Sequence, residues 1–292
     1  MEQVPKLLTA EIIYFGSFLV FPFLILIFYK RRKISSLIFF LIIVLSLLFI
    51  WSRFIETQII ITNETEIKTN FNTSIALIAD THLGVYKSES FLQDVVREIN
   101  NLTVDYVFIA GDFTFEPKTE NLEKLFSALS DIEKPIYAVL GNHDVEKPGP
   151  KIRQELVEVL KSNNVKIINN EIIQLQNFTL VGLGDAWIEE DNVKTLDTLT
   201  LEDRVVVLTH NPDTISKYTN KIPDFTLTGH THCGQIRIPI LYKYVIPTIG
   251  DFDKGLSNEE NTKLFITCGL GEVGLPMRLF NPPVIDVIKF TS

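Results

Sequence analysis

Residues 75–82 read Ile-Ala-Leu-Ile-Ala-Asp-Thr-His, an apolar run followed at once by an aspartate and a histidine. A short apolar run is typical of a strand that is buried on both faces. The pattern recurs twice further along the chain: residues 106–112 end in Gly-Asp, and residues 135–144 end in Gly-Asn-His-Asp. Each segment therefore predicts a buried strand with a polar cluster at its carboxyl end.

The segments between and after these strands predict the fold class. Helical spacing of apolar residues begins near Ser88, Thr119 and Pro150, so a helix is expected after each of the three strands. From Val165 onward the apolar runs follow one another closely, which indicates a second sheet. We expect an α/β fold in which two β-sheets pack as a sandwich flanked by helices. The later strands are expected at residues 165–168, 172–175, 178–182, 205–209, 225–228, 263–267 and 284–290.

The chain has five histidines, and all five lie in polar clusters that follow predicted strands. A lone histidine at a strand end is more often structural than a ligand, but five of five in such clusters favours a metal site. The carboxyl ends of neighbouring strands can converge on one crevice at the edge of a sheet. The clustered residues are Asp80, His82, Asp112, Asn142, His143, Asp144, His210, His230 and His232.

The order of these clusters resembles that of the calcineurin-like metallophosphoesterases. The likeness covers about residues 75–290 and rests on Asp-x-His at 80–82, Gly-Asp at 111–112, Gly-Asn-His at 141–143, His210 and Gly-His-x-His at 229–232. Residues 229–236, Gly-His-Thr-His-Cys-Gly-Gln-Ile, are similar to the bacterial YkuE/YaeI-like branch, which is typically membrane-linked. Gly-Leu-Gly at 269–271 followed by Leu-Pro at 275–276 adds to that likeness.

The resemblance implies a role for each clustered residue in a site with two divalent ions. Asp112 would bridge the ions, and His143 would contact the phosphoryl group and protonate the leaving oxygen, so these two are the expected catalytic residues. Asp144 would either orient a histidine from behind or cap nearby turn amides. The first ion would be held by Asp80, His82, Asp112 and His232, and the second by Asp112, Asn142, His210 and His230.

The expected ligands are carboxylates, an amide and imidazoles, without a thiolate. This set suits Mn²⁺, which we expect first, and also Fe or Zn²⁺. Two such ions activate a water for attack on phosphorus. The residues after Asp112 are Phe-Thr-Phe, so the second aspartate and the arginine of the protein phosphatases are missing, which weighs against a Ser/Thr protein phosphatase.

The N-terminal region predicts a membrane anchor. Residues 12–29 and 34–51 are two apolar runs of 18 residues, near the lower limit for crossing a bilayer, and four basic residues lie between them. A cleaved signal peptide is the alternative, but the residues around Trp51 are bulky rather than small. The basic turn should face the cytoplasm, which leaves the large domain outside the bacterial inner membrane in a multi-pass protein.

Charge and composition divide the chain at the same place. Residues 1–53, the predicted anchor, carry six lysines and arginines against two acidic residues, whereas the remainder carries 21 against 34. The net charge of this remainder is −13, and because an acidic domain repels a phosphate backbone, the charge argues against nucleic acid as a partner. Residues 54–74 are polar and predict a linker with an edge strand, and residues 75–292 form the predicted catalytic domain.

Two features near the last cluster leave alternatives open. Cys233 is either a small buried residue or the partner of Cys268 in a disulfide, since two cysteines are too few for a disulfide scaffold or a thiolate metal site. Residues 236–249 are unusually apolar, and they form either a pair of core strands or an apolar lip that touches the bilayer or an acyl chain.

These observations favour a phosphodiesterase or pyrophosphatase that acts on a lipid-linked substrate at the bilayer. UDP-2,3-diacylglucosamine hydrolysis in lipid A synthesis is an activity of related branches and gives a specific candidate, although a UDP-sugar belongs on the cytoplasmic side. One alternative is a phosphatase or nuclease of small soluble periplasmic phosphoesters. The other is an inactive, metal-binding interaction module, which would have lost ligands that this chain keeps.

Overall fold

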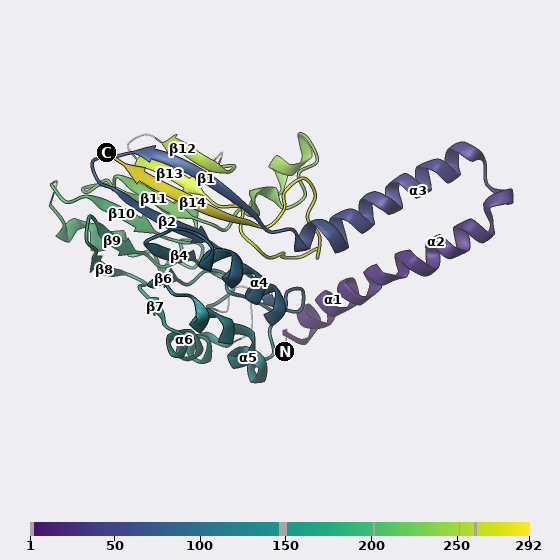
Figure 1. Ribbon diagram of the computed structural model, residues 1–292, viewed down its shortest axis with the longest axis horizontal. Helices are drawn as coiled ribbons and strands as arrows, with labels where there is room; N and C mark the ends of the chain where they lie inside the picture. The colour runs from purple at the N-terminus through teal and green to yellow at the C-terminus, as the bar shows by residue number, and fades with distance from the viewer. Residues whose placement is uncertain (1–2, 146–150, 201, 251, 260–261) are drawn as a thin grey trace.

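The computed structural model describes residues 3–145, 151–200, 202–250, 252–259 and 262–292. Two sheets pack face to face, helices α4, α5 and α6 cover one side, and a helical hairpin projects from the domain (Figure 1). The helix start expected at Pro150 lies outside the described residues. The predicted α/β sandwich flanked by helices is confirmed.

The first sheet has six strands in the order β1-β14-β2-β4-β6-β7. Strands β2, β4, β6 and β7 run parallel to one another, and β7 forms one edge. Strand β14 runs antiparallel to β2, and β1 forms the other edge beside β14. The strands are β1 Ile61–Lys68, β2 Thr73–Ile78, β4 Tyr106–Ala110, β6 Ile136–Val139, β7 Val165–Ile167 and β14 Val284–Thr291.

The second sheet also has six strands, in the order β12-β13-β11-β10-β9-β8. The central four are parallel, and both edge strands are antiparallel to their neighbours. The strands are β8 Glu171–Gln174, β9 Thr179–Gly182, β10 Val205–Leu208, β11 Phe225–Thr228, β12 Gly255–Glu259 and β13 Thr262–Ile266; β3 Leu83–Gly84 and β5 Thr114–Phe115 form a separate pair.

Alternation along the strands builds two cores. Ile75 and Leu77 of β2 face the second sheet, where they join Leu227 and Phe265 in one buried cluster. Ala76 and Ile78, which alternate with them, point the other way, into a cluster beneath the helices. The helices are α4 Glu89–Asn100, α5 Leu122–Phe126 and α6 Arg153–Ser162, with 3₁₀ turns at Thr119–Asn121, Ser127–Asp131, Val193–Thr198 and Pro212–Lys217.

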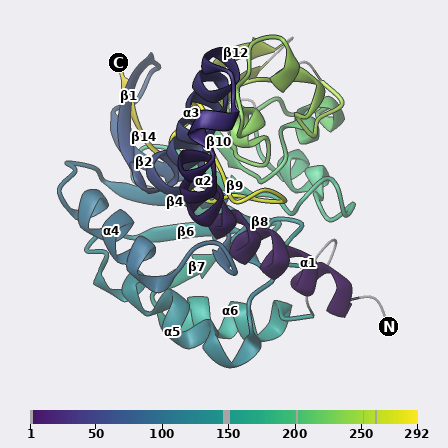
Figure 2. The same cartoon turned by 90° about the vertical axis from the view of Figure 1, so that its right-hand side faces the viewer.

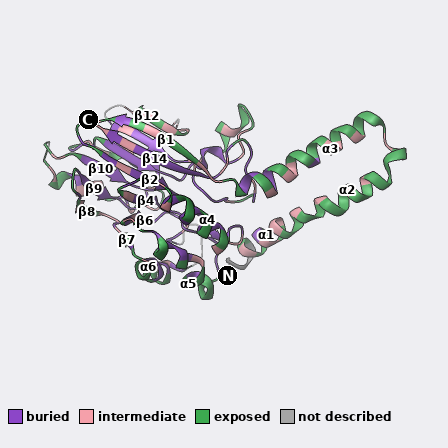
Figure 3. Cartoon of the chain, viewed as in Figure 1, coloured by how far each residue is buried: buried purple, intermediate pink, exposed green. Residues whose placement is uncertain are grey.

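The N-terminal region forms two long helical stretches. The first joins α1 Gln3–Gly16 to α2 Val20–Tyr29 through a 3₁₀ turn, Ser17–Leu19, and a 3₁₀ turn at Arg31–Lys33 leads to α3 Ser36–Ile50. A π-helical turn, Trp51–Ile55, and a 3₁₀ turn, Glu56–Gln58, extend α3. Most of the hairpin's side chains are exposed (Figure 3).

Lys6–Tyr29 and Ser36–Gln58 are candidate membrane spans of 24 and 23 residues, with mean hydropathies of 2.3 and 2.6. The first helix begins before the predicted run 12–29, and the second begins two residues after the start of the run 34–51 and ends beyond it. The second helix starts at Ser36 because Ile34 is extended and the Ser35 side chain accepts a hydrogen bond from the amide of Ile38. Residues 54–58, expected in a linker, belong to the helix end.

Candidate metal centre

The clustered polar residues lie on loops at the carboxyl ends of the parallel strands. Asp80 and His82 follow β2, Asp112 follows β4, and Asn142 follows β6 in the first sheet. In the second sheet His210 follows β10, and His230 and His232 follow β11. All seven are buried, so the two sheets together enclose one polar centre in an apolar surrounding.

The backbone at this centre is unusual. Asp80, His82 and Asp112 have φ values of 52°, 45° and 53°, and His230 and His232 have values of 68° and 46°. Non-glycine residues seldom adopt this left-handed conformation, and such strain concentrates at functional sites. The turns thereby aim five side chains into the same small volume.

Two glycines let the loops of the first sheet approach each other. A Cβ on Gly111, whose φ is 81°, would lie 2.6 Å from the amide nitrogen of Gly141. A Cβ on Gly141 would collide with the carboxylate of Asp112. A larger residue at position 111 would force the two loops apart, and one at position 141 would displace the carboxylate of Asp112.

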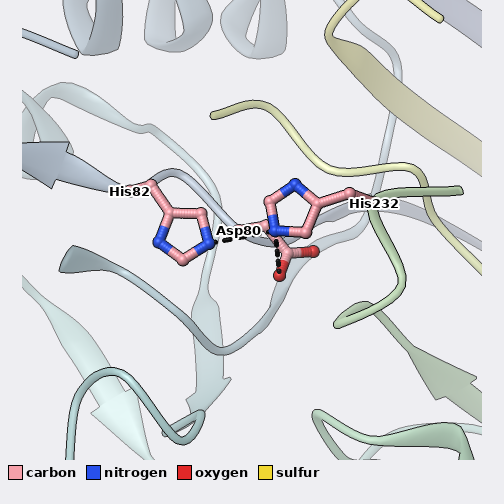
Figure 4. Close-up of side chains that lie close together, drawn as sticks. All are labelled: Asp80, His82 and His232. Atoms are coloured by element: carbon pink, nitrogen blue, oxygen red, sulfur yellow. Dashed lines mark hydrogen bonds and ion pairs between the residues drawn. The ribbon is translucent and has the colours of Figure 1, made fainter. Parts of the chain in front are cut away.

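Asp80, His82 and His232 form the first ligand group (Figure 4). The Nε2 atoms of His82 and His232 are 3.0 Å apart, and Nε2 of His232 is 3.5 Å from Oδ1 of Asp80. The two rings are nearly parallel, with an interplanar angle of 9°. One carboxylate oxygen and two imidazole nitrogens thus face a common point.

Asp112, His210 and His230 form the second group. Oδ2 of Asp112 is 3.2 Å from Nε2 of His210, which is in turn 3.0 Å from Nδ1 of His230. The same Asp112 oxygen is 3.6 Å from Nε2 of His82 in the first group. Asp112 therefore lies between the two groups.

Backbone carbonyls orient the histidine rings. Nδ1 of His82 is 3.1 Å from the carbonyl oxygen of Thr114, and Nδ1 of His210 is 2.6 Å from that of Ala110. Nε2 of His230 is 3.1 Å from the carbonyl oxygen of Pro247. A ring N–H that donates to a carbonyl leaves the opposite nitrogen as a lone pair aimed at the centre.

Asp144 contacts amides rather than a histidine. Its carboxylate accepts hydrogen bonds of 3.1 Å from the backbone N–H groups of Phe113, Thr114 and Gly141. The expectation that it orients a histidine is wrong, and the turn-capping alternative describes its contacts. Asp144 holds the loop after β4 against the loop after β6, and so supports Asp112 from behind.

The electrostatics of the centre suit cations. Burial raises the pKa of Asp80 to about 8, and burial lowers the pKa values of His82 and His230 to about 3. Burial opposes ionisation of Asp112 as well, but His210 beside it holds the pKa of that carboxyl well below its usual range. Buried carboxylates are costly without a counter-charge, and divalent ions supply one.

Two further observations test whether metal ions fit. The Nε2 atoms of His82 and His232 are 3.0 Å apart, and a cation between them would accept both lone pairs when neither nitrogen carries a proton. Oδ1 of Asn142 is buried without a hydrogen-bond partner among the described residues. The oxygen and nitrogen donors fit divalent transition metals, and the chemistry of the ligand set does not distinguish Mn²⁺, Fe and Zn²⁺.

His143 lies beside the centre and is not a member of either ligand group. Its ring centroid is 5.0 Å from that of His82, and its backbone N–H donates to Oδ1 of Asp112 over 2.9 Å. Burial lowers the pKa of the imidazole. The side chain lines a cavity of about 540 Å³ that opens off the metal centre.

The cavity is polar at one end and apolar at the other. Asp112, Asn142 and His143 line the polar end, and the apolar wall includes Ile238 and Leu241. The core-strand interpretation of residues 236–249 is wrong, because the segment is a loop with one 3₁₀ turn, Leu241–Tyr244, and has many exposed side chains. Several of its side chains line the cavity, which we call the groove from here on, and contact of this segment with a bilayer or an acyl chain stays a prediction.

Sequence reasoning missed a turn at the cavity rim. The Asp185 carboxylate accepts a 2.8 Å hydrogen bond from the amide of Trp187, whose ring lies 5.0 Å from that of His230 and is 54% exposed. Burial raises the pKa of Asp185 to about 6. The signal was present: Gly184-Asp185 follows β9 as Gly111-Asp112 follows β4.

A second missed set joins the helix end to the centre. Glu56 accepts a 2.6 Å hydrogen bond from the amide of Asn281, and Nδ2 of Asn281 donates to the carbonyl oxygen of His232 over 2.7 Å. Buried Glu272 lies 3.2 Å from Nζ of Lys87 and 3.5 Å from Nε of Arg278. Buried charged residues of this kind do not follow the periodicity of apolar residues, so their burial could not be predicted from the sequence.

The two cysteines, whose state the sequence left open, form a disulfide. Cys233 and Cys268 have Cα atoms 4.9 Å apart. Cys233 directly follows the ligand-group residue His232, so the bond ties the loop after β11 to the segment after β13. Disulfides persist in oxidising compartments.

A two-sheet α/β fold with two carboxylate–imidazole groups at one edge defines a metal-dependent hydrolase. The chain matches the calcineurin-like phosphoesterases over residues 73–234, more than half of its length, and it belongs to this family. It is a phosphoester hydrolase, and its two ligand groups fit the two divalent ions that the family uses.

The relatives of the chain include three bacterial proteins. An uncharacterized metallophosphoesterase of Campylobacter jejuni is 29% identical over 89% of this chain and 72% of its own length. The Escherichia coli phosphodiesterase YaeI is 28% identical over 74% of this chain and 81% of its own length. The UDP-2,3-diacylglucosamine pyrophosphatase LpxG of Chlamydia muridarum is 27% identical over 74% of this chain and 82% of its own length.

Proposed function

We propose that the protein is a dinuclear phosphodiesterase or pyrophosphatase of the bacterial inner membrane that hydrolyses a lipid-linked substrate. The observation that carries this proposal is the groove that leads directly from the ligand groups into an apolar wall. An amphiphilic phosphoester would place its phosphoryl group at one end and an acyl chain along the other. Burial of that chain would stabilise binding by about 25 cal/mol per Å² of apolar surface.

The ligand groups support an assignment of the metal-binding residues. Asp112, between the two groups, would bridge the ions, which supply Lewis acidity for water activation and offset charge on the phosphoryl oxygens. The first ion would be held by Asp80, His82, Asp112 and His232, and the second by Asp112, Asn142, His210 and His230.

His143 is the proposed catalytic residue outside the ligand set. Its imidazole lines the groove beside Asp112 and can donate a hydrogen bond to a phosphoryl oxygen. It would then transfer a proton to the leaving oxygen as the P–O bond breaks. Asp144 would contribute indirectly, because its hydrogen bonds to backbone amides fix the loops that carry Asp112 and Asn142.

We propose that the two apolar helices anchor residues 75–292 as a catalytic domain on the extracytoplasmic face of the membrane. The basic turn at residues 30–33 supports this orientation, and so does the disulfide between Cys233 and Cys268. A lipid-linked pyrophosphate or phosphodiester exposed on that face would be accessible to a domain with this orientation and this disulfide.

UDP-2,3-diacylglucosamine is the second candidate, favoured by the likeness to LpxG. A UDP-sugar is cytoplasmic, so this substrate requires the opposite orientation of the domain and a reduced cysteine pair. The substrate and the membrane orientation of the domain are thus linked, so an experiment that identifies one of them constrains the other.

A hydrolysis screen of the full chain in nanodiscs tests the proposal. The chain is loaded separately with Mn²⁺, Fe²⁺ or Zn²⁺ and offered UDP-2,3-diacylglucosamine, lipid-linked pyrophosphates and soluble chromogenic phosphodiesters. We expect the highest kcat/KM for a lipid-linked substrate. A preference for soluble phosphoesters under every metal would overturn the lipid assignment, and it would favour the soluble-substrate alternative.

A further inference from the structure

Two loops of the domain expose large apolar side chains. Ile240, Tyr244, Val245, Ile249 and Phe280 are between 65% and 95% exposed, and we call them the apolar rim. Ile240 also has a φ of 72°, an outlier for a β-branched residue. Contiguous exposed apolar surface is uncommon on soluble domains and marks an interaction site.

The rim comes from two loops that are bonded to each other. The amide of Arg237 donates to the carbonyl oxygen of Leu279 over 2.9 Å. In return, the amide of Leu279 donates to the carbonyl oxygen of Gln235 over 3.2 Å. Nε2 of Gln235 also donates to the carbonyl oxygen of Leu275 over 2.8 Å. These hydrogen bonds hold residues 235–237 of the first loop against residues 275–279 of the second.

The same loops are bonded to the end of the second apolar helix. The amide of Arg278 donates to the carbonyl oxygen of Ser52 over 2.9 Å. The loops lie beside the base of α3, on the side from which the hairpin projects (Figure 1). The view along the hairpin in Figure 2 also places these yellow-green loops next to the helices.

Aromatic and basic side chains mark the level at which the hairpin leaves the domain. The Arg53 guanidinium lies 4.5 Å from the ring centroid of Tyr14 and 4.7 Å from that of Phe54, and its Nε donates to Oγ of Ser17 over 2.9 Å. Arg53 is buried among these rings, and aromatic rings are enriched at membrane–water interfaces. Tyr244 and Lys243 in the rim loop repeat this composition.

We propose that the apolar rim inserts into the interfacial layer of the bilayer, so that the groove opens at the membrane surface. The occupant is the lipid bilayer because the rim is continuous with the point where two apolar helices leave the domain. This inference rests on the membrane anchoring in the proposed function, and it adds a second membrane contact by the catalytic domain itself.

The rim also continues to the metal centre. The carbonyl oxygen of Pro247, two residues before Ile249, faces Nε2 of His230 at 3.1 Å, and Ile238 and Leu241 line the groove between them. A lipid that enters at the rim thus meets apolar side chains along its way to the ligand groups. Docking of the rim removes the need for the acyl chain to cross water.

Fluorescence quenching of the full chain in nanodiscs tests the contact. Single cysteines at Tyr244, Leu41 and Ile172 are labelled with an environment-sensitive dye; Leu41 lies in α3, and Ile172 is exposed on β8, far from the hairpin in Figure 1. We expect lipids with a nitroxide near the headgroup to quench the Y244C label, a deep nitroxide to quench L41C, and neither to quench I172C. The native cysteines are paired and do not react.

Two outcomes overturn the inference. If Y244C behaves like I172C while L41C is quenched, the hairpin is in the bilayer and the rim is not. If L41C is also unquenched, membrane anchoring fails, and the inference fails with it. Neither result depends on turnover, so the quenching data and the substrate screen fail independently.

Activity supplies a second measurement. Ile240 and Ile249 do not belong to the groove lining, so I240S/I249S should keep full turnover of a soluble phosphodiester. Hydrolysis of a lipid-linked substrate in vesicles should fall roughly tenfold, because weaker docking reduces access. I172S is the matched control and should leave both activities unchanged. Equal vesicle activity in I240S/I249S and I172S would overturn the inference.

Discussion

The Oδ2 atom of Asp112 lies 3.2 Å from Nε2 of His210, and both side chains are buried. The carboxylate keeps its charge at this depth because its neighbours are imidazoles, and it faces both ligand groups at once. Loss of that charge should therefore affect two ions rather than one.

The first prediction is that Asp112→Asn removes bound metal and lowers kcat/KM at least ~10²-fold, since an amide lacks the bridging charge. Elemental analysis of the purified chain should fall from two ions per chain to one or none. Asp94→Asn, at an exposed carboxylate in helix α4, is the control and should keep both ions. An active wild-type preparation with fewer than two ions per chain contradicts the dinuclear assignment.

The second prediction separates chemistry from metal binding. His143→Ala should keep both ions and lower kcat by ~10²–10⁴-fold, the usual scale for a general acid. The reason is that His143 lines the groove without belonging to either ligand group. Parallel loss of metal and activity would show that His143 is a ligand.

The third prediction concerns Trp187 at the groove rim. Its indole packs edge-on against His230 and is half exposed, so it can contact bound substrate directly. Trp187→Ala should raise KM about 2- to 10-fold with little change in kcat, as expected for loss of one aromatic contact. Trp187→Phe should restore most of the affinity; an unchanged KM in the alanine variant would exclude a substrate contact.

The fourth prediction concerns compartment. A reporter enzyme fused after Ser292 should be active outside the cytoplasm, and the cysteines should resist alkylation in isolated membranes until a reductant is added. The two readouts are linked because Cys233 and Cys268 are bonded. Reporter activity confined to the cytoplasm, with freely alkylated cysteines, would contradict the orientation and favour UDP-2,3-diacylglucosamine.

The fifth prediction is a pH dependence of stability. Burial raises the pKa of Asp286 in β14 to about 6, above the usual value of 3.8. The folded state therefore binds this proton more tightly than the unfolded state, and stability falls as pH rises from about 4 through 6. Asp286→Asn should raise the free energy of unfolding by up to about 3 kcal/mol above pH 7.

Thermal unfolding of the detergent-solubilised chain checks this. The Tm difference between Asp286→Asn and wild type should be small at pH 4 and should grow to a plateau near pH 7. A difference that is the same at both pH values would mean that the change acts through packing rather than through ionisation.

The fold could be predicted from the sequence because each buried strand is a short apolar run. Segments such as residues 106–110 are too short for buried helices and are followed directly by glycine, so their strand assignment follows from length and turn chemistry alone. The parallel order then brings the strand ends together, which is why Asp80 and His232, far apart in the chain, meet in one group.

Other features had no local signal. Residues 236–249 are apolar because their side chains wall a groove and face outward, yet a strand between two sheets would have the same composition. The contacts of Asp144 depend on how closely two loops approach, which Gly111 and Gly141 permit but do not specify. The buried charges of Lys87 and Arg278 contradict the general preference of such residues for the surface, so only the structure locates them.

The hydrogen-bonded path from Glu56 through Asn281 to the backbone of His232 has a consequence for where the catalytic unit begins. Nε1 of Trp51 donates to the other oxygen of Glu56 over 2.7 Å, so the path starts within the second apolar helix. A shortened chain that starts at residue 59 would keep every proposed ligand but would leave the amide of Asn281 without its acceptor. Soluble versions of this enzyme should therefore begin no later than Trp51, because the last turns of the second apolar helix contribute to the support of the metal centre.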